Sequence, residues 1–269
     1  MKCQETKMLT IKLDFDGENG YNYVTKKELL LLLFIRKAFE MKVTWLTQAG
    51  LLFENSRLKI MVDPYLTDSL GEIKPDKKRR IPADESFFDI SPDVILLTHS
   101  HIDHTDINTL ERVLAGCTNP ALVLASESAY EVVCNLGGEH NYVLLAPHSV
   151  WSERGVTFYA VNAEHSDRDA VGFIIDDGKQ TFYVSGDTIY NYDVIDDVLD
   201  LAPDGVDYAF LPINGKGNNM NAHDAADFAY EIGARCAIPV HYGLTDDLTP
   251  DEFDFDDRLI LEPYKETKL

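Results

Sequence analysis

The sequence is poor in cysteine and in basic residues. Its four cysteines, at positions 3, 117, 134 and 236, are far apart and form no C-x-x-C pair. That usage argues against a disulfide framework and predicts reduced thiols in a cytoplasmic protein. Lysine and arginine total 24 against 46 aspartates and glutamates, which gives a formal net charge of -22. Because such a surface repels phosphate backbones at long range, the composition disfavours nucleic acid as a partner.

The chain also lacks an apolar run of membrane-spanning length. The run at residues 29–35 holds seven apolar residues, whereas a transmembrane helix needs about 20. A mixed, partly acidic stretch precedes it, where a secretory signal would have a short basic lead. Thr25 and Glu28 form a capping box ahead of the run. We therefore predict no membrane span, and a short apolar helix within an N-terminal extension, residues 1–40. That helix would pack on the core or on a subunit partner in a homo-oligomer, with peripheral membrane contact as the less favoured alternative.

The remaining length, residues 41–269, is enough for one large domain with a sizeable core. Three apolar runs separated by turn residues predict an antiparallel meander at residues 42–47, 51–54 and 58–62. Further strands are predicted at residues 94–97, 121–125, 143–146, 156–163, 171–175, 181–184, 208–212 and 237–240. Helices are predicted at residues 107–114, with Asp106 as N-cap, and at 127–136, 192–199 and 222–232. This alternation alone predicts an α/β or α+β fold.

Histidine is scarce, with eight in the chain, yet three fall within six consecutive positions. The stretch is His99-Ser100-His101-Ile102-Asp103-His104, directly after an apolar run. Residues two apart in an extended chain point the same way, so His99 and His101 can close on one ion. The following turn lets Asp103 and His104 reach a second ion. Because imidazole and carboxylate both suit divalent metals, the stretch predicts a metal site rather than a polar turn.

Three more potential ligands stand just after other apolar runs. They are His165, Asp187 and His241. If each run is a strand, these side chains lie at strand carboxyl ends and line one edge of a sheet together with the first motif, where open α/β folds place their sites. Each residue alone is weak evidence, but together they complete a ligand set for two metal ions.

This order of residues resembles the metallo-β-lactamase superfamily, whose pattern is H-x-H-x-D-H, then a lone His, a lone Asp and a final His. The resemblance implies an α+β fold, a four-layer αββα sandwich. Within the superfamily, the chain is similar over roughly residues 41–242 to the branch of predicted metal-dependent hydrolases that contains the ascorbate-6-phosphate lactonases. The stretches that carry this similarity are residues 45–50, 62–65, 185–188, 211–215, 222–226 and 239–242.

The resemblance also implies a role for each ligand. His99, His101 and His165 would hold one metal ion. Asp103, His104 and His241 would hold the other, and Asp187 would bridge both. No thiolate is in the set, so zinc, manganese and iron all suit these donors. The similarity to the lactonases favours Mn²⁺ or Zn²⁺ over iron.

Four residues are candidates around the ligands. Gln48 stands where that branch usually has His, which leaves the substrate side of the site open. Like Gln48, Asn214 and His223 are candidate substrate contacts. Asp63 is either an acceptor that orients a ligand histidine through its other ring nitrogen, or a turn residue before proline.

Residues 74–80, Lys-Pro-Asp-Lys-Lys-Arg-Arg, are the one basic cluster in this acidic chain. A run of this kind is usually a solvated loop. If it instead folds over the metals, it would attract an anionic substrate. The glycine-rich loop at residues 215–221 lacks the G-x-x-x-x-G-K-[ST] form, so the sequence does not predict a nucleotide-binding loop.

The ligand set predicts hydrolysis. Two divalent ions about 3.5 to 4 Å apart can share a water and lower its pKa to around 7, which supplies hydroxide at neutral pH. We expect attack on a carbonyl of a small anionic substrate, such as a sugar-phosphate lactone. Asp103 would orient the water and pass its proton to the leaving group, and Asp187 would fix the separation of the ions, so both are candidate catalytic residues.

Two alternatives remain open from the sequence. The first is a phosphodiesterase acting on a nucleotide, RNA or lipid, because the same kind of site can attack phosphorus. The second is a non-catalytic metal-binding scaffold. An Asp187→Ala variant separates an enzyme from a scaffold, since only an enzyme would lose its function while keeping its fold.

Overall fold

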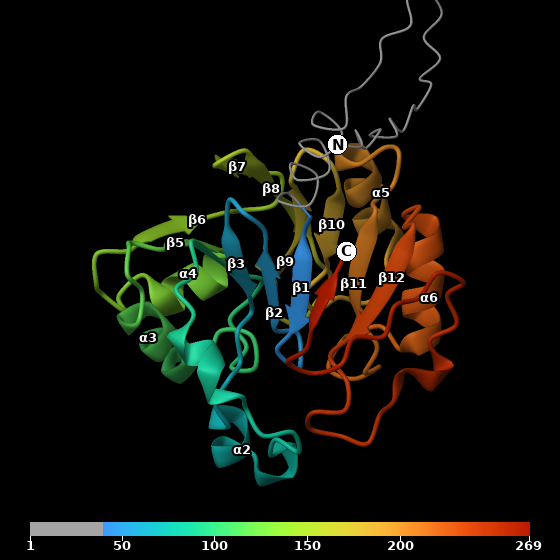
Figure 1. The fold of residues 1–269 in the computed structure, drawn as a ribbon. Helices are drawn as coiled ribbons and strands as arrows, with labels where there is room; N and C mark the ends of the chain where they lie inside the picture. The colour runs from blue at the N-terminus through green and yellow to red at the C-terminus, as the bar shows by residue number, and fades with distance from the viewer. Residues whose placement is uncertain (1–39) are drawn as a thin grey trace, which may run out of the picture.

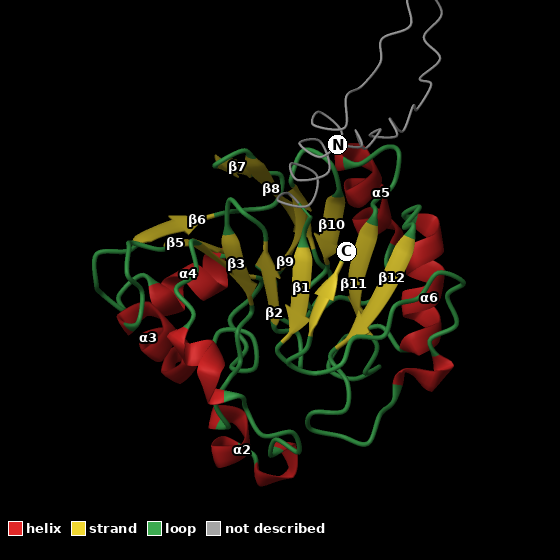
Figure 2. Ribbon diagram, in the orientation of Figure 1, coloured by secondary structure: helices red, strands yellow, loops and turns green. Residues whose placement is uncertain are grey.

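Short apolar runs form two β-sheets that pack face to face, with helices outside both (Figure 1). The structure is a computed structural model that describes residues 40–269, so the N-terminal extension and its expected apolar helix lie outside the described residues. Figure 2 shows the helices on the two outer sides of the paired sheets. This arrangement is the predicted αββα sandwich.

The first sheet has seven strands in the order β13-β1-β2-β3-β4-β5-β6. Their bounds are Lys42–Trp45 for β1, Leu51–Glu54 for β2, Lys59–Val62 for β3, Val94–Leu97 for β4, Leu122–Ala125 for β5, Asn141–Leu144 for β6 and Glu266–Lys268 for β13. The predicted antiparallel meander is confirmed in β1 to β3, and the pairs from β3 to β6 are parallel.

The second sheet has six strands in the order β12-β11-β10-β9-β8-β7. Their bounds are Val150–Glu153 for β7, Val156–Asn162 for β8, Val171–Asp176 for β9, Thr181–Val184 for β10, Tyr208–Pro212 for β11 and Cys236–Val240 for β12. Strands β7 to β10 are antiparallel, and β10, β11 and β12 are parallel.

Helices cover the outer face of each sheet. Helices α3 and α4 pack on the first sheet, and α5 and α6 pack on the second. Their bounds are Ile107–Ala115 for α3, Glu127–Val133 for α4, Tyr192–Leu201 for α5 and Ala222–Glu231 for α6. The predicted cap of α3 is confirmed, because the Asp106 side chain accepts a hydrogen bond from the Thr109 amide. Among the described residues, no helix is long and apolar enough to cross a bilayer.

Two hydrophobic layers hold the sandwich together, and β4 contributes to both. Val94 and Leu96 face the core between the sheets, whereas Ile95 and Leu97 face the layer under α3 and α4. Successive residues of a strand point to opposite faces, so a strand buried on both sides must be apolar throughout. Across this central core, Phe53 of β2 makes aromatic contacts with the second sheet. Each buried Phe contributes roughly 1.5–3 kcal/mol of transfer free energy.

Several boundaries differ from the sequence-based prediction. Strand β1 ends at Trp45 rather than at residue 47, because Thr47 and Gln48 adopt positive φ angles of 74° and 49°, which a strand cannot contain. Strand β6 begins two residues earlier than predicted, and α4 ends three residues earlier. Strands β7 and β13 and the five-residue helix α2, Ser69–Ile73, were not predicted.

Candidate metal centre

The seven candidate ligands lie at the carboxyl ends of four strands. His99, His101, Asp103 and His104 follow β4. His165 follows β8, Asp187 follows β10 and His241 comes directly after β12. The prediction that they line one edge of a single sheet is wrong, because β4 belongs to the first sheet and the other three strands to the second. The site therefore lies where the two sheets meet.

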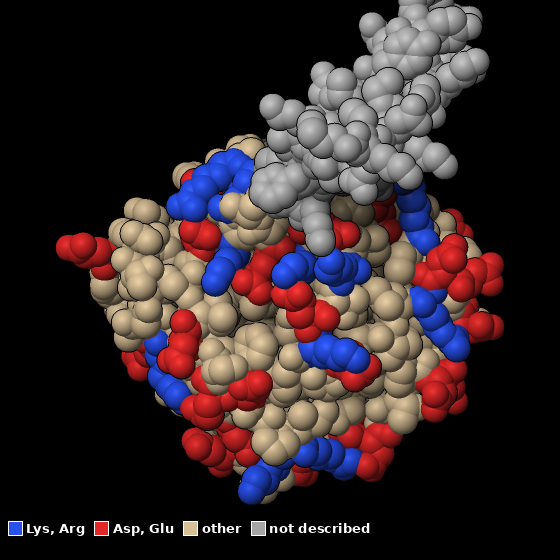
Figure 3. All heavy atoms as spheres, viewed as in Figure 1, with Lys and Arg blue, Asp and Glu red and all other residues tan. Residues whose placement is uncertain are grey.

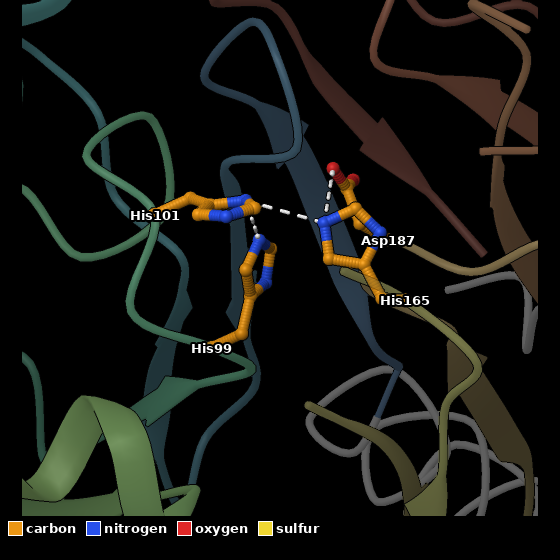
Figure 4. A group of neighbouring side chains, drawn as sticks. All are labelled: His99, His101, His165 and Asp187. Carbon is orange, nitrogen blue, oxygen red and sulfur yellow. Dashed lines mark hydrogen bonds and ion pairs between the residues drawn. The ribbon is translucent and has the colours of Figure 1, made fainter. Parts of the chain in front are cut away.

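The first group of ligand atoms comes from His99, His101, His165 and Asp187. Figure 4 shows the four side chains pointing toward one another. His101 Nδ1 lies 3.0 Å from His99 Nε2 and 3.2 Å from His165 Nε2, and His165 Nε2 lies 3.8 Å from Asp187 Oδ2. Four ligands about 2.1 Å from one ion in a tetrahedron would be about 3.4 Å apart, so these spacings fit a small divalent metal.

The second group of ligand atoms comes from Asp103, His104 and His241. His241 Nε2 lies 3.5 Å from Asp103 Oδ2. Asp187 also reaches this group, since its Oδ1 lies 3.3 Å from His104 Nε2 and 3.4 Å from His241 Nε2. The two oxygens of one carboxylate thus face the two groups, which is the geometry a bridging ligand needs.

Two buried atoms at the junction of the groups lack a hydrogen bond. Within residues 40–269, His104 Nε2 and Asp187 Oδ1 are both buried and neither completes one. An unsatisfied buried polar atom costs about 1–3 kcal/mol, and more when it is charged. A cation between the two would satisfy both, so these residues fit a bound metal.

The outer nitrogens of two ligand histidines are held by a buried network around Asp63. His104 Nδ1 donates to Asp63 Oδ2 at 2.8 Å, and the Thr98 hydroxyl donates to the same oxygen at 2.5 Å. The Thr98 hydroxyl in turn accepts from His99 Nδ1 at 3.0 Å. Both rings are thereby held with Nε2 facing the ligand groups, which is how partners behind ligand histidines orient them in metal sites.

Three further hydrogen bonds orient three of the other candidate ligands. His165 Nδ1 donates to the Asn218 carbonyl at 3.1 Å. The side-chain amide of Gln48 donates to Asp103 Oδ2 at 2.7 Å. The backbone N–H of His241 donates to the backbone carbonyl of Gln48 at 2.9 Å. Gln48 therefore joins the residue after β12 to the loop after β1 and directs the Asp103 carboxylate.

The carboxylates and histidines of the site shift one another's pKa values. Burial lowers the pKa of His104 and His241, but Asp187 outweighs it and raises both. Burial raises the pKa of Asp187, but His241 and His104 outweigh it and hold the pKa well below its usual value. Burial also lowers the pKa of His99 well below its usual value, with a smaller effect from His104. Asp187 is therefore ionised and His99 neutral at pH 7, which are the forms that bind metal.

A glycine makes the approach of Asp187 to the other sheet feasible. Gly186 has a positive φ of 60°, and a Cβ there would lie 2.8 Å from the Thr98 Cβ. Only glycine fits both the left-handed backbone and the contact with Thr98. The Ser-Gly-Asp order at residues 185–187 thus places the shared carboxylate against the end of β4.

A cavity of about 290 Å³ opens above the ligand groups. Gln48 and Asn214, two of the three sequence-predicted substrate contacts, line it. The third, His223, does not reach the cavity; its side chain is 83% exposed and lies 3.8 Å from Asp227 Oδ2. The first turn of α6 points this side chain to solvent.

Several residues of the site were not predicted from the sequence. Thr98 and Asp167 are the clearest, because Thr98 links Asp63 to His99, and Asp167 Oδ2 accepts from the amide and the hydroxyl of Ser100. Thr98 directly precedes the histidine motif, a position that could have signalled it. Asp167 had no comparable signal, because it reaches Ser100 only through the fold.

Comparisons with known proteins agree with this geometry. Residues 59–242 match the model of the beta-lactamase superfamily domain. A UPF0173 metal-dependent hydrolase of Carboxydothermus hydrogenoformans is 27% identical over 224 residues, which cover 81% of this chain and 92% of that protein. One of Desulforamulus reducens is 29% identical over 217 residues, covering 75% and 84%.

Solved structures show the same fold. Igni18, a metallo hydrolase of Ignicoccus hospitalis, superposes with a TM-score of 0.68 at 19% identity and covers 85% of this chain and 98% of its own. A putative metal-dependent hydrolase of Parabacteroides distasonis gives a TM-score of 0.62 at 24% identity, covering 83% and 93%. With its αββα layers, its converging histidines and aspartates and the domain match over residues 59–242, the chain belongs to the metallo-β-lactamase superfamily.

Proposed function

We propose that this protein hydrolyses a small anionic carbonyl compound, such as a sugar-phosphate lactone, with two divalent ions as cofactors. One observation carries the proposal: the two ligand groups share Asp187, whose Oδ2 faces His165 and whose Oδ1 faces His104 and His241. When bound, such a pair of ions lowers the pKa of a shared water to about 7 and polarises a carbonyl oxygen.

Two sets of residues would hold the two ions. His99, His101 and His165 would hold one ion, and Asp103, His104 and His241 the other. Asp187 would hold both and fix their separation. The donors are imidazoles and carboxylates without a thiolate, and we propose Mn²⁺ or Zn²⁺ as the metal.

Asp103 is suited to move the proton of the reaction. Burial raises its pKa, but His241 and His104 hold the pKa well below its usual value, so the group is a carboxylate at neutral pH. Gln48 fixes the carboxylate by donating to Oδ2. Asp103 would orient the attacking water and accept its proton. The proton then passes to the alkoxide released when the acyl carbon–oxygen bond breaks.

The size of the cavity supports a small substrate. At about 290 Å³ it lies near the lower end of the range for ligand pockets, roughly 300–1,000 Å³. Its lining includes Gln48 and Asn214, which can hydrogen-bond a polar substrate. A compact polar compound therefore fits better than a polymer.

The test compares carbonyl and phosphorus chemistry in one assay. Protein reconstituted with Mn²⁺ or Zn²⁺ is given a sugar-phosphate lactone and, separately, an activated phosphodiester, with Asp187→Ala as the blank. Metal-dependent lactone opening without diester cleavage is the expected result. Diester cleavage alone would overturn the proposal in favour of a phosphodiesterase, and bound metal with no turnover of either would indicate a scaffold.

A further inference from the structure

Three lysines from two distant segments line the cavity above the ligand groups. Lys77 lies in the 3-10 turn Pro75–Lys77, directly after Lys74, and Lys216 lies in the loop between β11 and α6. The two segments are about 140 residues apart in the chain, so the fold alone brings them to one opening. The basic cluster at residues 74–80 therefore contributes to the cavity instead of lying wholly in solvent.

Many basic residues of the described part of the chain pair with an acidic residue, whereas the three cavity lysines do not. Lys42 pairs with Glu266, Lys59 with Glu54 and Arg80 with Asp247. By contrast, none of the three cavity lysines forms an ion pair with a carboxylate of residues 40–269. In a chain with 46 acidic and 24 basic residues, three such ammonium groups around one cavity indicate a site for an anion.

None of the three carboxylates of the same cavity forms an ion pair with these lysines. Two of them, Asp103 and Asp187, are candidate metal ligands. The third, Asp246, uses its Oδ1 to accept hydrogen bonds from the amides of Gly243 and Leu248. Figure 3 shows basic side chains at the α2 end of the molecule, on a face where acidic side chains are frequent.

The cavity also contains a buried acceptor without a partner. Asn219 is 8% exposed, and its Oδ1 has no hydrogen bond to any described residue. Asn214 Oδ1 is likewise buried and without a partner in the described part of the chain. Both residues line the cavity together with Lys216. Such acceptors suit a ligand that carries hydroxyl groups beside its charge.

We propose that Lys74, Lys77 and Lys216 bind the phosphate monoester of a hydroxylated substrate, while Asn214 and Asn219 accept hydrogen bonds from its hydroxyls. Three ammonium groups suit a group that carries about 1.5 to 2 negative charges at pH 7 better than a single carboxylate. The proposal rests on the proposed function for the site beneath, and it adds the side chains that would bind the phosphate and the hydroxyls of such a substrate.

The experiment uses metal-loaded full-length protein and a matched pair of substrates, a sugar δ-lactone and its 6-phosphate. The variants are Lys74→Gln/Lys77→Gln/Lys216→Gln and, as a control, Lys78→Gln, because Lys78 is exposed, adjacent and outside the cavity lining. In the triple variant we expect kcat/KM for the phosphorylated lactone to fall about 10- to 100-fold, mainly through KM. The value for the neutral lactone should change less than about twofold, and Lys78→Gln should alter neither.

Equal losses on both lactones, or no loss on either, would overturn the lysine site. If wild-type protein opens neither lactone, the proposed function fails and the lysine site is tested by binding alone. Isothermal titration of glycerol 3-phosphate into the metal-loaded protein should then show about tenfold weaker binding by the triple variant and unchanged binding by Lys78→Gln. Equal affinities would overturn the proposal, and circular dichroism establishes that each variant is folded.

Discussion

The ligand groups at the floor of the cavity and the lysines at its rim are built in opposite ways. The floor residues follow buried strands, and neighbours such as Asp63 and Gln48 fix their orientation. The rim residues stand on short turns and a glycine-rich loop without acidic partners among residues 40–269. A rigid floor can hold reacting groups in fixed geometry, whereas an adaptable rim can select which molecule reaches them.

The strongest test of the floor is Asp187→Asn, which keeps the shape of the side chain and removes its charge. Because both ligand groups share this carboxylate, we expect turnover of every substrate to fall by about 10³ or more. Metal content measured by mass spectrometry should fall as well. Turnover within tenfold of wild type would show that Asp187 is not a shared ligand.

The next test changes Asp63, which orients a floor histidine but is not itself a candidate ligand. In Asp63→Asn, His104 Nδ1 and the Thr98 hydroxyl lose a charged acceptor. We expect metal affinity, measured by competition with a chelator, to fall about 10- to 100-fold. Excess metal should restore most of the turnover, and unchanged affinity would contradict the role given to Asp63.

Gln48 lies between floor and rim, and its replacement should have an intermediate effect. Gln48→Ala removes the hydrogen bond to Asp103 Oδ2, so we expect kcat/KM to fall about tenfold. Gln48→His can donate a similar bond and should stay within about threefold of wild type. If both variants lose activity equally, the side-chain donor is not what matters at this position.

The smallest effect is expected for Asp167→Asn, which acts on the loop that carries His99 and His101. Burial raises the pKa of Asp167, but hydrogen bonds from Ser100 and Ser128 hold it below its usual value. A lowered folded-state pKa adds stability above the unfolded-state pKa of about 3.9, and this stability is lost as the pH falls through the folded-state value. Urea unfolding at pH 7 should show a loss of about 1–2 kcal/mol, after allowance for solvent screening. The difference between variant and wild type should shrink below pH 4, and a constant difference would contradict the linkage.

The core elements and the ligand residues could be predicted because their signals are local. Strands such as Val94–Leu97 and Tyr208–Pro212 are continuous apolar runs, and the histidine motif follows one of them directly. All seven candidate ligands named from the sequence come together in the structure. Their distribution over two sheets was not predicted, because strand order depends on pairing between distant segments.

The missed elements carry little local signal. Strand β13 is the polar triplet Glu266–Lys268, which forms only by pairing with β1, where Lys42 lies opposite Lys268. Strand β7 is an exposed edge strand of four residues. Strand β13 pairs with a segment more than 200 residues away and has no apolar periodicity of its own, so it cannot be recognised from its own residues.

The sequence by itself determined the apolar runs that become strands and the donor types of the candidate metal centre, because both are encoded over a few residues. Its residue pattern also carried the resemblance to the superfamily, and that resemblance implied the αββα layers. Only the tertiary structure decided that Asp63 lies behind His104, that Gln48 holds Asp103, and that Lys216 joins the lysines before β4 at one cavity. The physical reason is that these contacts join residues about 40 to 140 positions apart, and such contacts form only when strands distant in the chain pair and the two sheets pack.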